Sequence, residues 1–269
     1  MIIIKSINKL NKEVNFKANI GFVPTMGALH KGHLSLIESS KKKCQKTIVS
    51  IFVNPSQFNN KKDYKKYPRN ISKDLNILKK LNIEYVFLPK KKDILKNKYS
   101  MKIKLKKKDK ILCAKYRKGH FEGVLNVMNR LLNIIRAKKI FMGEKDYQQI
   151  YIIKKFIKKK FNTKIISGKT IRISGLLACS SRNFLLTYRN LKTGSLVAKI
   201  IKKYYYLLKR NFKNLNQLKE INNEISNLGV KIEYLEVRNK YNLSKKINKS
   251  NFKIFISYYI NNIRLIDNF

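Results

Sequence analysis

The sequence predicts an α/β fold in which a mostly parallel sheet is covered by helices on both faces and is followed by a smaller α+β domain. Short apolar runs alternate with helical patterns over roughly the first 170 residues, as in chains that form parallel sheets. Beyond that point the alternation stops, and two helical stretches are followed by two strand-like ones. We therefore expect a larger domain at residues 1–170 and a small α+β domain at residues 171–269.

Four apolar runs are expected to form strands in the first domain, since each is bounded by proline, glycine or polar residues. They are IGFVPT at 20–25, TIVSIFVNP at 47–55, EYVFLP at 84–89 and KIFMGE at 139–144. The clearest helix covers residues 121–139, where apolar residues recur at three- and four-residue steps; others begin near Lys31 and span 146–161. Ligands of such sheets bind beyond the carboxyl ends of the strands, which indicates the loops after VPT, FVNP and MGE.

The second domain is predicted from longer elements. Helical patterns cover residues 191–210 and 215–228, and strand patterns cover VKIEYLEV at 230–237 and FKIFISYYI at 252–260. The segment GLLACSSRN at 175–183 comes before them and has the composition of a loop.

The chain is strongly basic. It has 62 Lys+Arg against 15 Asp+Glu and a formal charge of +47, which raises nucleic acid or an acidic membrane as partners. The lysines are spread along the chain among isoleucine and asparagine, residues that AT-rich codons also encode, rather than clustered on one segment. We favour codon composition as the cause and expect no specific nucleic-acid binding. With 43% hydrophobic and 11% aromatic residues, the chain should fold.

Cellular location is predicted from cysteines and apolar segments. The three cysteines, Cys44, Cys113 and Cys179, form no metal-spaced set and fit a reduced compartment. The first apolar run is too short for a signal peptide, and no window offers the ~18 apolar residues of a membrane span. We expect a soluble cytoplasmic protein that is not bound to a membrane.

Two of the three histidines lie in FVPTMGALHKGHLSLI, at residues 22–37. His30 and His33 are expected at a strand-to-helix turn, with their side chains on one face. Helix N-termini attract phosphate, and imidazoles can donate hydrogen bonds to phosphoryl oxygens as charge develops during transfer. Two alternatives stay open. The pair could be surface histidines or metal ligands, although neither a carboxylate nor a cysteine accompanies them at ligand spacing.

The stretch resembles the H-x-G-H signature of the nucleotidyltransferase superfamily, which carries adenylyl transfer on a Rossmann-like, doubly wound sheet. More narrowly, VPTMGALHKGH resembles the pantothenate synthetase family. Six further segments agree with that family in order along the chain: SIFVNPSQF (50–58), YPRN (67–70), GHFEGV (119–124), MGEKDYQQ (142–149), SSRN (180–183) and RLIDN (264–268).

The resemblance implies a ligase reaction. ATP and (R)-pantoate would give pantoyl adenylate and pyrophosphate, and β-alanine would then attack to give pantothenate and AMP. Magnesium is expected with ATP, through ligands that the sequence does not indicate. The resemblance also implies a homodimer through the first domain, and a second domain that closes over the active site.

The resemblance assigns roles to individual residues. Catalytic roles fall to His30, to His33 as the proton donor, and to Lys145 as a phosphate-binding cation. Gln57 and Gln149 are expected to bind pantoate or β-alanine. The residues expected to bind ATP are Met26, Gly27, Ala28, Leu29, His30, Lys31, Gly32, His33, Gly143, Glu144, Lys145, Asp146, Ile171, Cys179, Ser180, Ser181 and Arg182.

Further residues near these motifs are also interpreted. Asn54 and Tyr67 are expected beside the pantoate pocket, and Arg117 could meet a phosphate or carboxylate. We read His120 as a hydrogen-bonded structural histidine rather than a catalytic one.

The chain departs from the family pattern at three places. Ser56 and Cys179 each stand where a methionine is usual, and Gly175-Leu176 replaces Asp-Gly before residues 179–182, here called the serine loop. Two other functions remain alternatives. One is an H-x-G-H nucleotidyltransferase whose acceptor is a phosphate ester, and the other is a basic nucleic-acid-binding protein on the same scaffold. A decayed enzyme is disfavoured because every expected catalytic position is filled.

Overall fold

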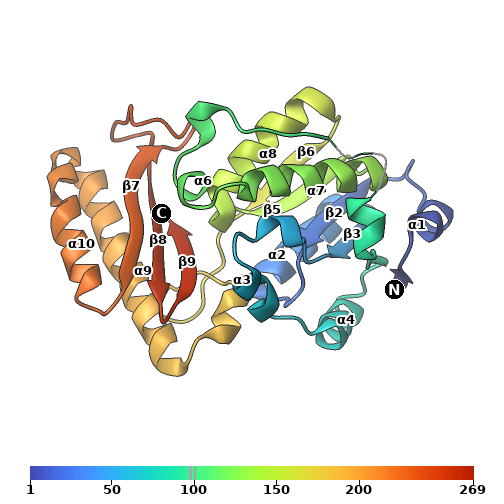
Figure 1. Cartoon of the computed structure of the whole chain (residues 1–269), viewed down its shortest axis with the longest axis horizontal. Helices are drawn as coiled ribbons and strands as arrows, with labels where there is room; N and C mark the ends of the chain where they lie inside the picture. Colours follow the sequence, from blue (N-terminus) through green and yellow to red (C-terminus); the bar gives the residue numbers. More distant parts are fainter. Residues whose placement is uncertain (97–98, 100) are drawn as a thin grey trace. The chain divides into compact units, whose positions relative to one another are not determined.

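The computed structural model describes residues 1–96, 99 and 101–269, and the chain divides into two compact units (Figure 1). Unit 1 contains residues 1–144 and 149–169, and unit 2 contains residues 145–148 and 170–269. Within the described part of the chain, no helix is both long and apolar enough to cross a bilayer.

Unit 1 is built on a six-stranded parallel sheet in the order β1-β4-β3-β2-β5-β6. Its strands are β1 (Ile2–Ile4), β2 (Ile20–Thr25), β3 (Lys46–Ile51), β4 (Tyr85–Phe87), β5 (Lys139–Gly143) and β6 (Lys164–Gly168). Its helices are α1 (Ile7–Glu13), α2 (Lys31–Lys43), α3 (Lys61–Lys66), α4 (Ile71–Lys80), α5 (Lys91–Leu95), α6 (Cys113–Tyr116), α7 (His120–Ile134) and α8 (Tyr147–Lys160), the last of which begins in unit 2. Three 3₁₀ turns are η1 (Pro55–Gln57), η2 (Lys107–Asp109) and η3 (Glu144–Asp146).

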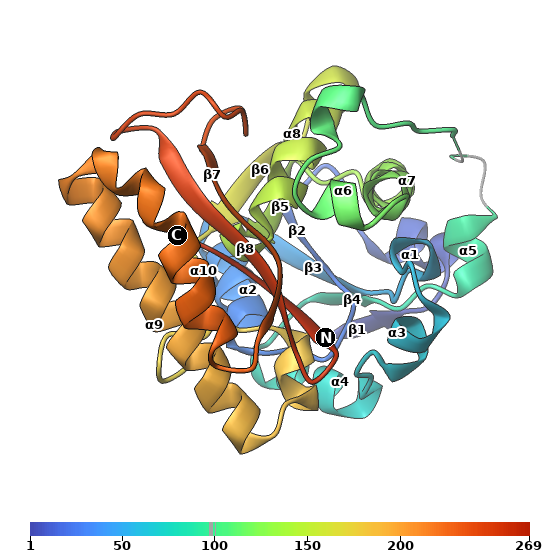
Figure 2. The ribbon, with the colours of Figure 1, turned by 60° about the vertical axis from the view of Figure 1, so that its left-hand side comes forward.

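Both faces of the sheet are buried at its central strand β2. Phe22 and Val23 are neighbours in β2 and therefore point to opposite faces, yet each is 0% exposed. Val23 lies in a cluster with Leu36 and Ile37 of α2, and α2 and α7 lie on opposite faces of the sheet (Figure 2). The arrangement confirms the doubly wound fold expected from the alternating pattern.

The direction of winding reverses at β2. The chain runs from β2 outward through β3 to β4, and then returns to the other side of β2 with β5 and β6. Such a reversal opens a crevice at the carboxyl ends of the two strands that flank it. In unit 1 these ends belong to β2 and β5, which carry the turn before α2 and the start of η3.

Several boundaries differ from the prediction. The strand expected to reach Pro55 ends at Ile51, because Pro55 opens η1 after the cap residue Asn54. The helix expected to reach residue 139 ends at Ile134. Ile135 and Ala137 are buried, so the apolar pattern continues through the loop after the helix has ended.

Unit 2 pairs a three-stranded antiparallel sheet with helices. Its strands are β7 (Lys231–Asn239), β8 (Phe252–Ile260) and β9 (Ile263–Asn268), in that order. Its other elements are η4 (Ser181–Leu185), α9 (Tyr188–Arg210), η5 (Phe212–Gln217) and α10 (Leu218–Ser226). They agree with the predicted α+β domain, with the addition of β9 and η5.

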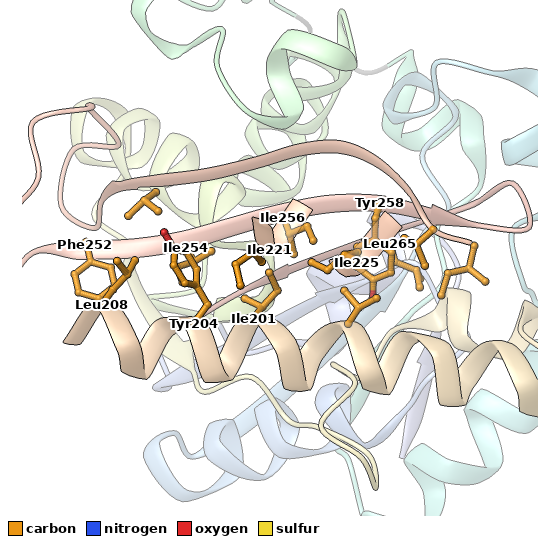
Figure 3. Packing of buried hydrophobic residues seen from close by; sticks show 14 residues of the cluster. Ile201, Tyr204, Leu208, Ile221, Ile225, Phe252, Ile254, Ile256, Tyr258 and Leu265 are labelled. Carbon is orange, nitrogen blue, oxygen red and sulfur yellow. The ribbon is translucent and has the colours of Figure 1, made fainter. Parts of the chain in front are cut away.

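The core of unit 2 lies between α9 and the sheet. Ile201, Tyr204 and Leu208 follow one another at three- and four-residue steps on α9 and face the sheet, where Ile254 and Tyr258 of β8 lie (Figure 3). All five side chains are 1% exposed or less. This apolar stripe explains why the helix was visible in the sequence.

Candidate active site

The turn that follows β2 is strained and tightly hydrogen-bonded. Gly27 and Ala28 have φ angles of 78° and 52°, in the left-handed region that glycine adopts most readily. The Gly27 N–H donates to Thr25 Oγ1 over 3.2 Å, while the Thr25 hydroxyl donates to the carbonyl of Ser50 on β3 over 2.8 Å. The turn is thus anchored to the neighbouring strand.

A buried carboxylate holds the next part of the turn. The N–H groups of Ala28 and Leu29 donate to Asp74 Oδ2 and Oδ1, each over 2.8 Å. Asp74 lies in the first turn of α4 and is 2% exposed. Our sequence reasoning missed this residue, because it lies 46 residues from Ala28 and no local pattern links the two.

The histidine pair caps the helix that begins after the turn. His30 Nδ1 accepts from the Gly32 N–H over 3.1 Å, and His33 Nδ1 accepts from the His30 N–H over 3.4 Å. The ring centroids are 4.0 Å apart. A neutral imidazole whose Nδ1 accepts must carry its proton on Nε2, so the cap selects the Nε2–H form of both rings. The pair therefore lies at the predicted strand-to-helix turn.

The loop after β3 is packed against α7. A Cβ at Gly123 would lie 2.2 Å from the Ser56 carbonyl oxygen, so only glycine allows this approach. The Asn54 amide donates to the Gly123 carbonyl over 3.2 Å, and its oxygen accepts from the Ser56 hydroxyl over 2.8 Å. Asn54, expected beside the pantoate pocket, is fully buried and supports the loop from within.

Gln57 is held at its backbone by the side chains of Arg117, which caps the end of α6, and His120, the first residue of α7. Its carbonyl oxygen accepts from His120 Nδ1 over 2.7 Å and from the Arg117 guanidinium over 3.0 Å. Arg117 also contacts His120 Nε2 over 3.0 Å. Since a guanidinium can only donate, His120 Nε2 accepts and its Nδ1 carries the proton. Both ring nitrogens of His120 are therefore hydrogen-bonded, as the sequence interpretation expected, and its structural rather than catalytic role stays a prediction.

Within unit 1, the predicted residues gather at the carboxyl edge of the sheet. The pairing of β2 with β3 brings Thr25 opposite Ile51, and the β2–β5 pairing brings Phe22 opposite Ile140, so the three strands end side by side. The unit 1 residues at or just after these strand ends are Met26, Gly27, Ala28, Leu29, His30, Lys31, Gly32, His33, Gln57, Gly143 and Glu144, and Gln149 follows on the first turns of α8.

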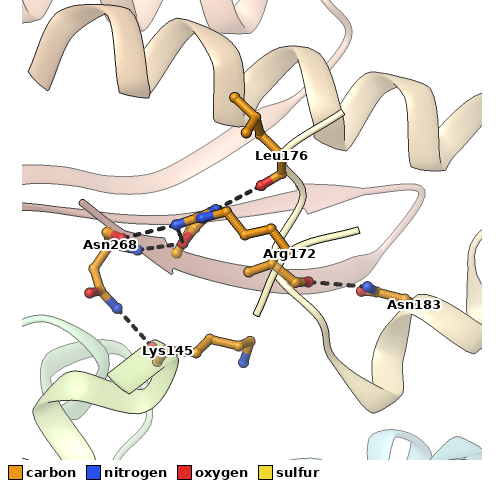
Figure 4. A network of polar contacts seen from close by, with 7 residues as sticks. Lys145, Arg172, Leu176, Asn183 and Asn268 are labelled. Atoms are coloured by element: carbon orange, nitrogen blue, oxygen red, sulfur yellow. Dashed lines mark hydrogen bonds and ion pairs between the residues drawn. The ribbon is translucent and has the colours of Figure 1, made fainter. Parts of the chain in front are cut away.

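The remaining predicted residues belong to unit 2, where a polar network ties two of their segments to the last strand (Figure 4). Arg172 donates to both carboxylate oxygens of Asp267, over 2.6 and 2.9 Å, and to the Leu176 carbonyl over 2.8 Å. The Asn268 amide donates to the Lys145 carbonyl over 2.9 Å. Strand β9 therefore anchors both the turn at Lys145 and the segment that leads into the serine loop.

Arg172 and Asp267 form an ion pair that is largely shielded from solvent. The Asp267 side chain is 3% exposed and that of Arg172 is 19% exposed. Burial raises the pKa of the Asp267 carboxyl, while the hydrogen bonds and charge of Arg172 act in the opposite direction.

The serine loop, residues 179–182, is a compact turn. The Cys179 N–H donates to the Ile171 carbonyl over 2.9 Å, and Ser180 caps η4 by accepting from the Arg182 N–H over 3.3 Å. Cys179 and Ser181 are each 5% exposed, whereas Ser180 and Arg182 are partly exposed. The smaller side chain of Cys179 therefore lies in the interior of unit 2.

The departure at Gly175-Leu176 produces an unusual backbone. Gly175 has φ 84° and Leu176 has φ 78°, although left-handed geometry is unfavourable for a residue with a Cβ. The turn is closed by a hydrogen bond from the Leu176 N–H to the Ile173 carbonyl and is held by Arg172 at the Leu176 carbonyl. The strained residue thus lies just before the serine loop.

A lysine and an aspartate lie close together just after β5. Lys145 Nζ lies 3.4 Å from Asp146 Oδ1, and their side chains are 18% and 46% exposed. No group of three or more His, Cys, Asp or Glu side chains in the described residues could hold a metal ion.

Comparison with known proteins identifies the family. A model of the pantoate-beta-alanine ligase family matches residues 2–269. The chain belongs to this family of enzymes. The pantothenate synthetase of Francisella tularensis subsp. mediasiatica (strain FSC147) is 40% identical over 268 residues, which cover 99% of this chain and 95% of that protein.

Solved structures of pantoate-beta-alanine ligases share the whole fold. A crystal structure of the enzyme from Francisella tularensis, complexed with beta-gamma ATP and beta-alanine, matches with a TM-score of 0.86 and 39% identity, covering 100% of this chain and 97% of that one. The pantothenate synthetase of Thermus thermophilus matches with a TM-score of 0.91 and 25% identity, covering 100% of this chain and 99% of that one.

Proposed function

We propose that this chain condenses (R)-pantoate with β-alanine at the expense of ATP. In the first step the pantoate carboxylate attacks the α-phosphorus of ATP, forming pantoyl adenylate and releasing pyrophosphate. In the second step the β-alanine amine attacks the acyl carbon, forming the amide bond of pantothenate and releasing AMP and a proton. Family membership supports the overall reaction, and the histidine pair after β2 is the observation that carries the adenylyl-transfer mechanism.

The capped imidazoles suit this first step. Because Nδ1 of each ring accepts a backbone N–H, each neutral ring presents its Nε2–H as a hydrogen-bond donor. Attack of a carboxylate on a phosphate builds negative charge on phosphoryl oxygens, which such donors stabilise. A positioned donor of this kind contributes ~3 kcal/mol to lowering the barrier.

Side chains rather than backbone groups are proposed to bind the phosphates. The N–H groups of Ala28 and Leu29 in the turn donate to Asp74, and that of Gly32 in the first turn of α2 donates to His30, so these three donors are already engaged. By resemblance, His30, His33 and Lys145 contact phosphate oxygens. The other groups proposed to contact ATP are those of the β2 turn, Gly143, Glu144, Asp146, Ile171 and residues 179–182.

Gln57 and Gln149 are proposed to bind pantoate or β-alanine. A neutral amide can donate to a carboxylate and accept from a hydroxyl or an ammonium group, which fits both small acids. The clamp of His120 and Arg117 on the Gln57 carbonyl supports this role, because it fixes the backbone that carries the amide.

Magnesium is proposed to enter with ATP. The absence of a three-ligand cluster among the described residues does not fit a resident metal, but it fits an ion held mainly by substrate phosphates and water. Magnesium bound in this way would neutralise phosphate charge and improve pyrophosphate as a leaving group.

We further infer that the protein is a cytoplasmic homodimer. Sedimentation velocity of the purified protein would test the dimer by measuring its mass.

The test is formation of AMP and pantothenate by the purified protein with ATP, magnesium, (R)-pantoate and β-alanine, omitting each substrate in turn. Pantothenate should require all three organic substrates, and pyrophosphate should require pantoate but not β-alanine. Pyrophosphate release with a phosphate-ester acceptor in place of pantoate would favour the related nucleotidyltransferase. Tight, salt-dependent RNA or DNA binding without turnover would favour the nucleic-acid alternative.

A matched pair of variants tests the histidine role. In His33→Asn an amide oxygen can take the place of Nδ1 as the acceptor of the cap, but nothing takes the place of Nε2. We expect normal stability with a roughly 10²–10³-fold lower kcat. His33→Ala should lose both the cap and the activity. Turnover by His33→Asn within about threefold of the wild-type rate would exclude His33 as the donor.

A further inference from the structure

Three consecutive N–H groups in the turn after β2 point to side-chain oxygens of the protein itself. Gly27 donates to Thr25 Oγ1, and Ala28 and Leu29 donate to the two oxygens of Asp74. Successive N–H groups in left-handed geometry form a concavity that binds anions. Here the anion is the Asp74 carboxylate of α4, which is 2% exposed.

We propose that Asp74 is a positioning residue for ATP: it fixes the backbone on which His30 and His33 are mounted and keeps their Nε2–H groups aligned for the phosphates. This proposal rests on the proposed function. Asp74 touches neither substrate nor the reacting atoms in this scheme, and it acts only through the turn.

The geometry explains why a carboxylate is required. Both oxygens accept from N–H groups at 2.8 Å, whereas an asparagine would direct its NH₂ toward one of those donors. A Cβ at Gly27 would lie 2.9 Å from Asp74 Oδ2, so this close approach of the carboxylate requires a glycine at position 27. The conformation of the turn is therefore fixed by its hydrogen bonds to the Asp74 carboxylate and by the close packing of Gly27 against that carboxylate.

The Asp74 carboxylate is connected to the two histidines through the backbone of Leu29 and His30. Leu29, the last residue that Asp74 holds, precedes His30, whose own N–H donates to His33 Nδ1. If the Leu29 N–H loses its partner, the His30 backbone can rotate and the hydrogen bond that fixes the His33 tautomer is weakened. Loss of Asp74 should therefore alter both imidazoles without removing either.

A purely structural role for Asp74 is the competing explanation. As an acidic residue in the first turn of α4, it also stabilises that helix end, as carboxylates do generally. Such a role would lower the unfolding temperature, yet a folded variant would bind ATP normally and show unchanged histidine tautomers.

The experiment compares wild type, Asp74→Asn and the control Glu38→Gln, which removes an exposed carboxylate from α2. Binding of a non-hydrolysable ATP analogue is measured by calorimetry, and histidine tautomers are read from long-range ¹H–¹⁵N spectra. The chain has only three histidines, and His120 serves as an internal reference because its Nδ1 carries the proton. These readouts do not depend on turnover, so failure of the proposed reaction is recognised separately, as a wild type that makes no pantothenate.

We expect Asp74→Asn to bind the analogue roughly ten- to hundredfold more weakly, while His30 and His33 lose their uniform Nε2–H signature. Glu38→Gln should match wild type in both. Wild-type affinity and tautomers in folded Asp74→Asn would overturn the proposal. If Asp74→Asn does not fold, Gly27→Ala displaces the carboxylate while keeping its charge. Altered His30 and His33 signals in that variant would support the proposal, and unchanged ones would overturn it.

Discussion

Each unit holds a proposed ATP-binding loop with a buried carboxylate, but the two carboxylates have different partners. Asp74 in unit 1 accepts from two neutral backbone N–H groups, whereas Asp267 in unit 2 accepts from the Arg172 guanidinium. Removing the first leaves two polar groups without their acceptor, and removing the second leaves a largely buried cation without its counter-charge. We infer that Asp267 matters more for stability and that Asp74 matters more for the histidine geometry.

The largest effect is expected from Asp267→Asn. Breaking a buried ion pair from one side generally destabilises a protein by about 3–5 kcal/mol, because the remaining charge stays desolvated. Urea unfolding followed by circular dichroism should show this loss. The double variant Arg172→Met/Asp267→Leu is the control, since replacing both charges by apolar groups should recover most of the stability. A single variant as stable as wild type would remove the distinction between the two carboxylates.

Asp74→Asn should destabilise less, by about 1–3 kcal/mol in the same urea experiment, because no uncompensated charge remains. The contrast is sharpened by ranking both variants by their loss of stability and by the change in their histidine spectra. We expect the larger loss of stability in Asp267→Asn and the larger change in the histidine spectra in Asp74→Asn. If one variant ranks first in both measurements, the two carboxylates do not divide the roles in the way that we infer.

Glu233→Gln tests a third, less buried carboxylate. Burial by itself would raise the pKa of Glu233, but the hydrogen bonds and charge of Arg264, together with Tyr259 and Ser257, outweigh it, so the pKa is lowered. A lowered pKa gives stability that is present above the unfolded carboxyl value of about 4.3 and is lost as pH falls through the folded value.

The difference in unfolding free energy between wild type and Glu233→Gln should therefore be about 1–2 kcal/mol at pH 7 and shrink below pH 4. Arg264 Nε lies 3.1 and 3.3 Å from the two Glu233 carboxylate oxygens, and a second guanidinium nitrogen also donates to Oε2, which supports this magnitude. A difference that stays constant from pH 7 to pH 3 would show that the charge of Glu233 does not contribute.

Elements with a complete local signal were predictable from sequence. The strand Ile20–Thr25 and the helix Lys31–Lys43 were recognised because a fully apolar run and a capped amphipathic run follow each other directly. Strands β1 and β6 were missed because both lie at sheet edges, where β1 is only three residues long and β6 carries polar residues on a partly exposed surface. For β9 a signal was present. Asn261 and Asn262, both with positive φ, make the two-residue turn between β8 and β9, and asparagine favours such turns.

The residues of the candidate site also differ in whether a local sequence signal marks them. The histidines, Lys145 and the serines could be proposed from the sequence because each lies in a short motif. Asp74 and Asp267 were not assigned roles, since their partners lie 46 and 95 residues away in the chain. Only the packing of α4 against the turn and of β9 against residue 172 creates these contacts, and such long-range packing leaves no periodic trace in one sequence.

The smallest effect, and the only one with the opposite sign, is expected at Leu176. Its φ of 78° strains a residue that carries a Cβ, and Arg172 holds its carbonyl in place. Leu176→Gly should relieve this strain, although glycine loses more backbone entropy on folding. We therefore expect the free energy of unfolding to rise by only about 0.5–1 kcal/mol. Leu176→Ala is the matched control, because it removes the side chain but keeps the Cβ. If glycine is no more stabilising than alanine in urea unfolding, the Arg172–Asp267 pair is not holding a strained turn. If Leu176→Gly is more stable and binds the ATP analogue as wild type does, the Arg172–Asp267 pair restrains the turn, and the strain at Leu176 does not contribute to ligand binding.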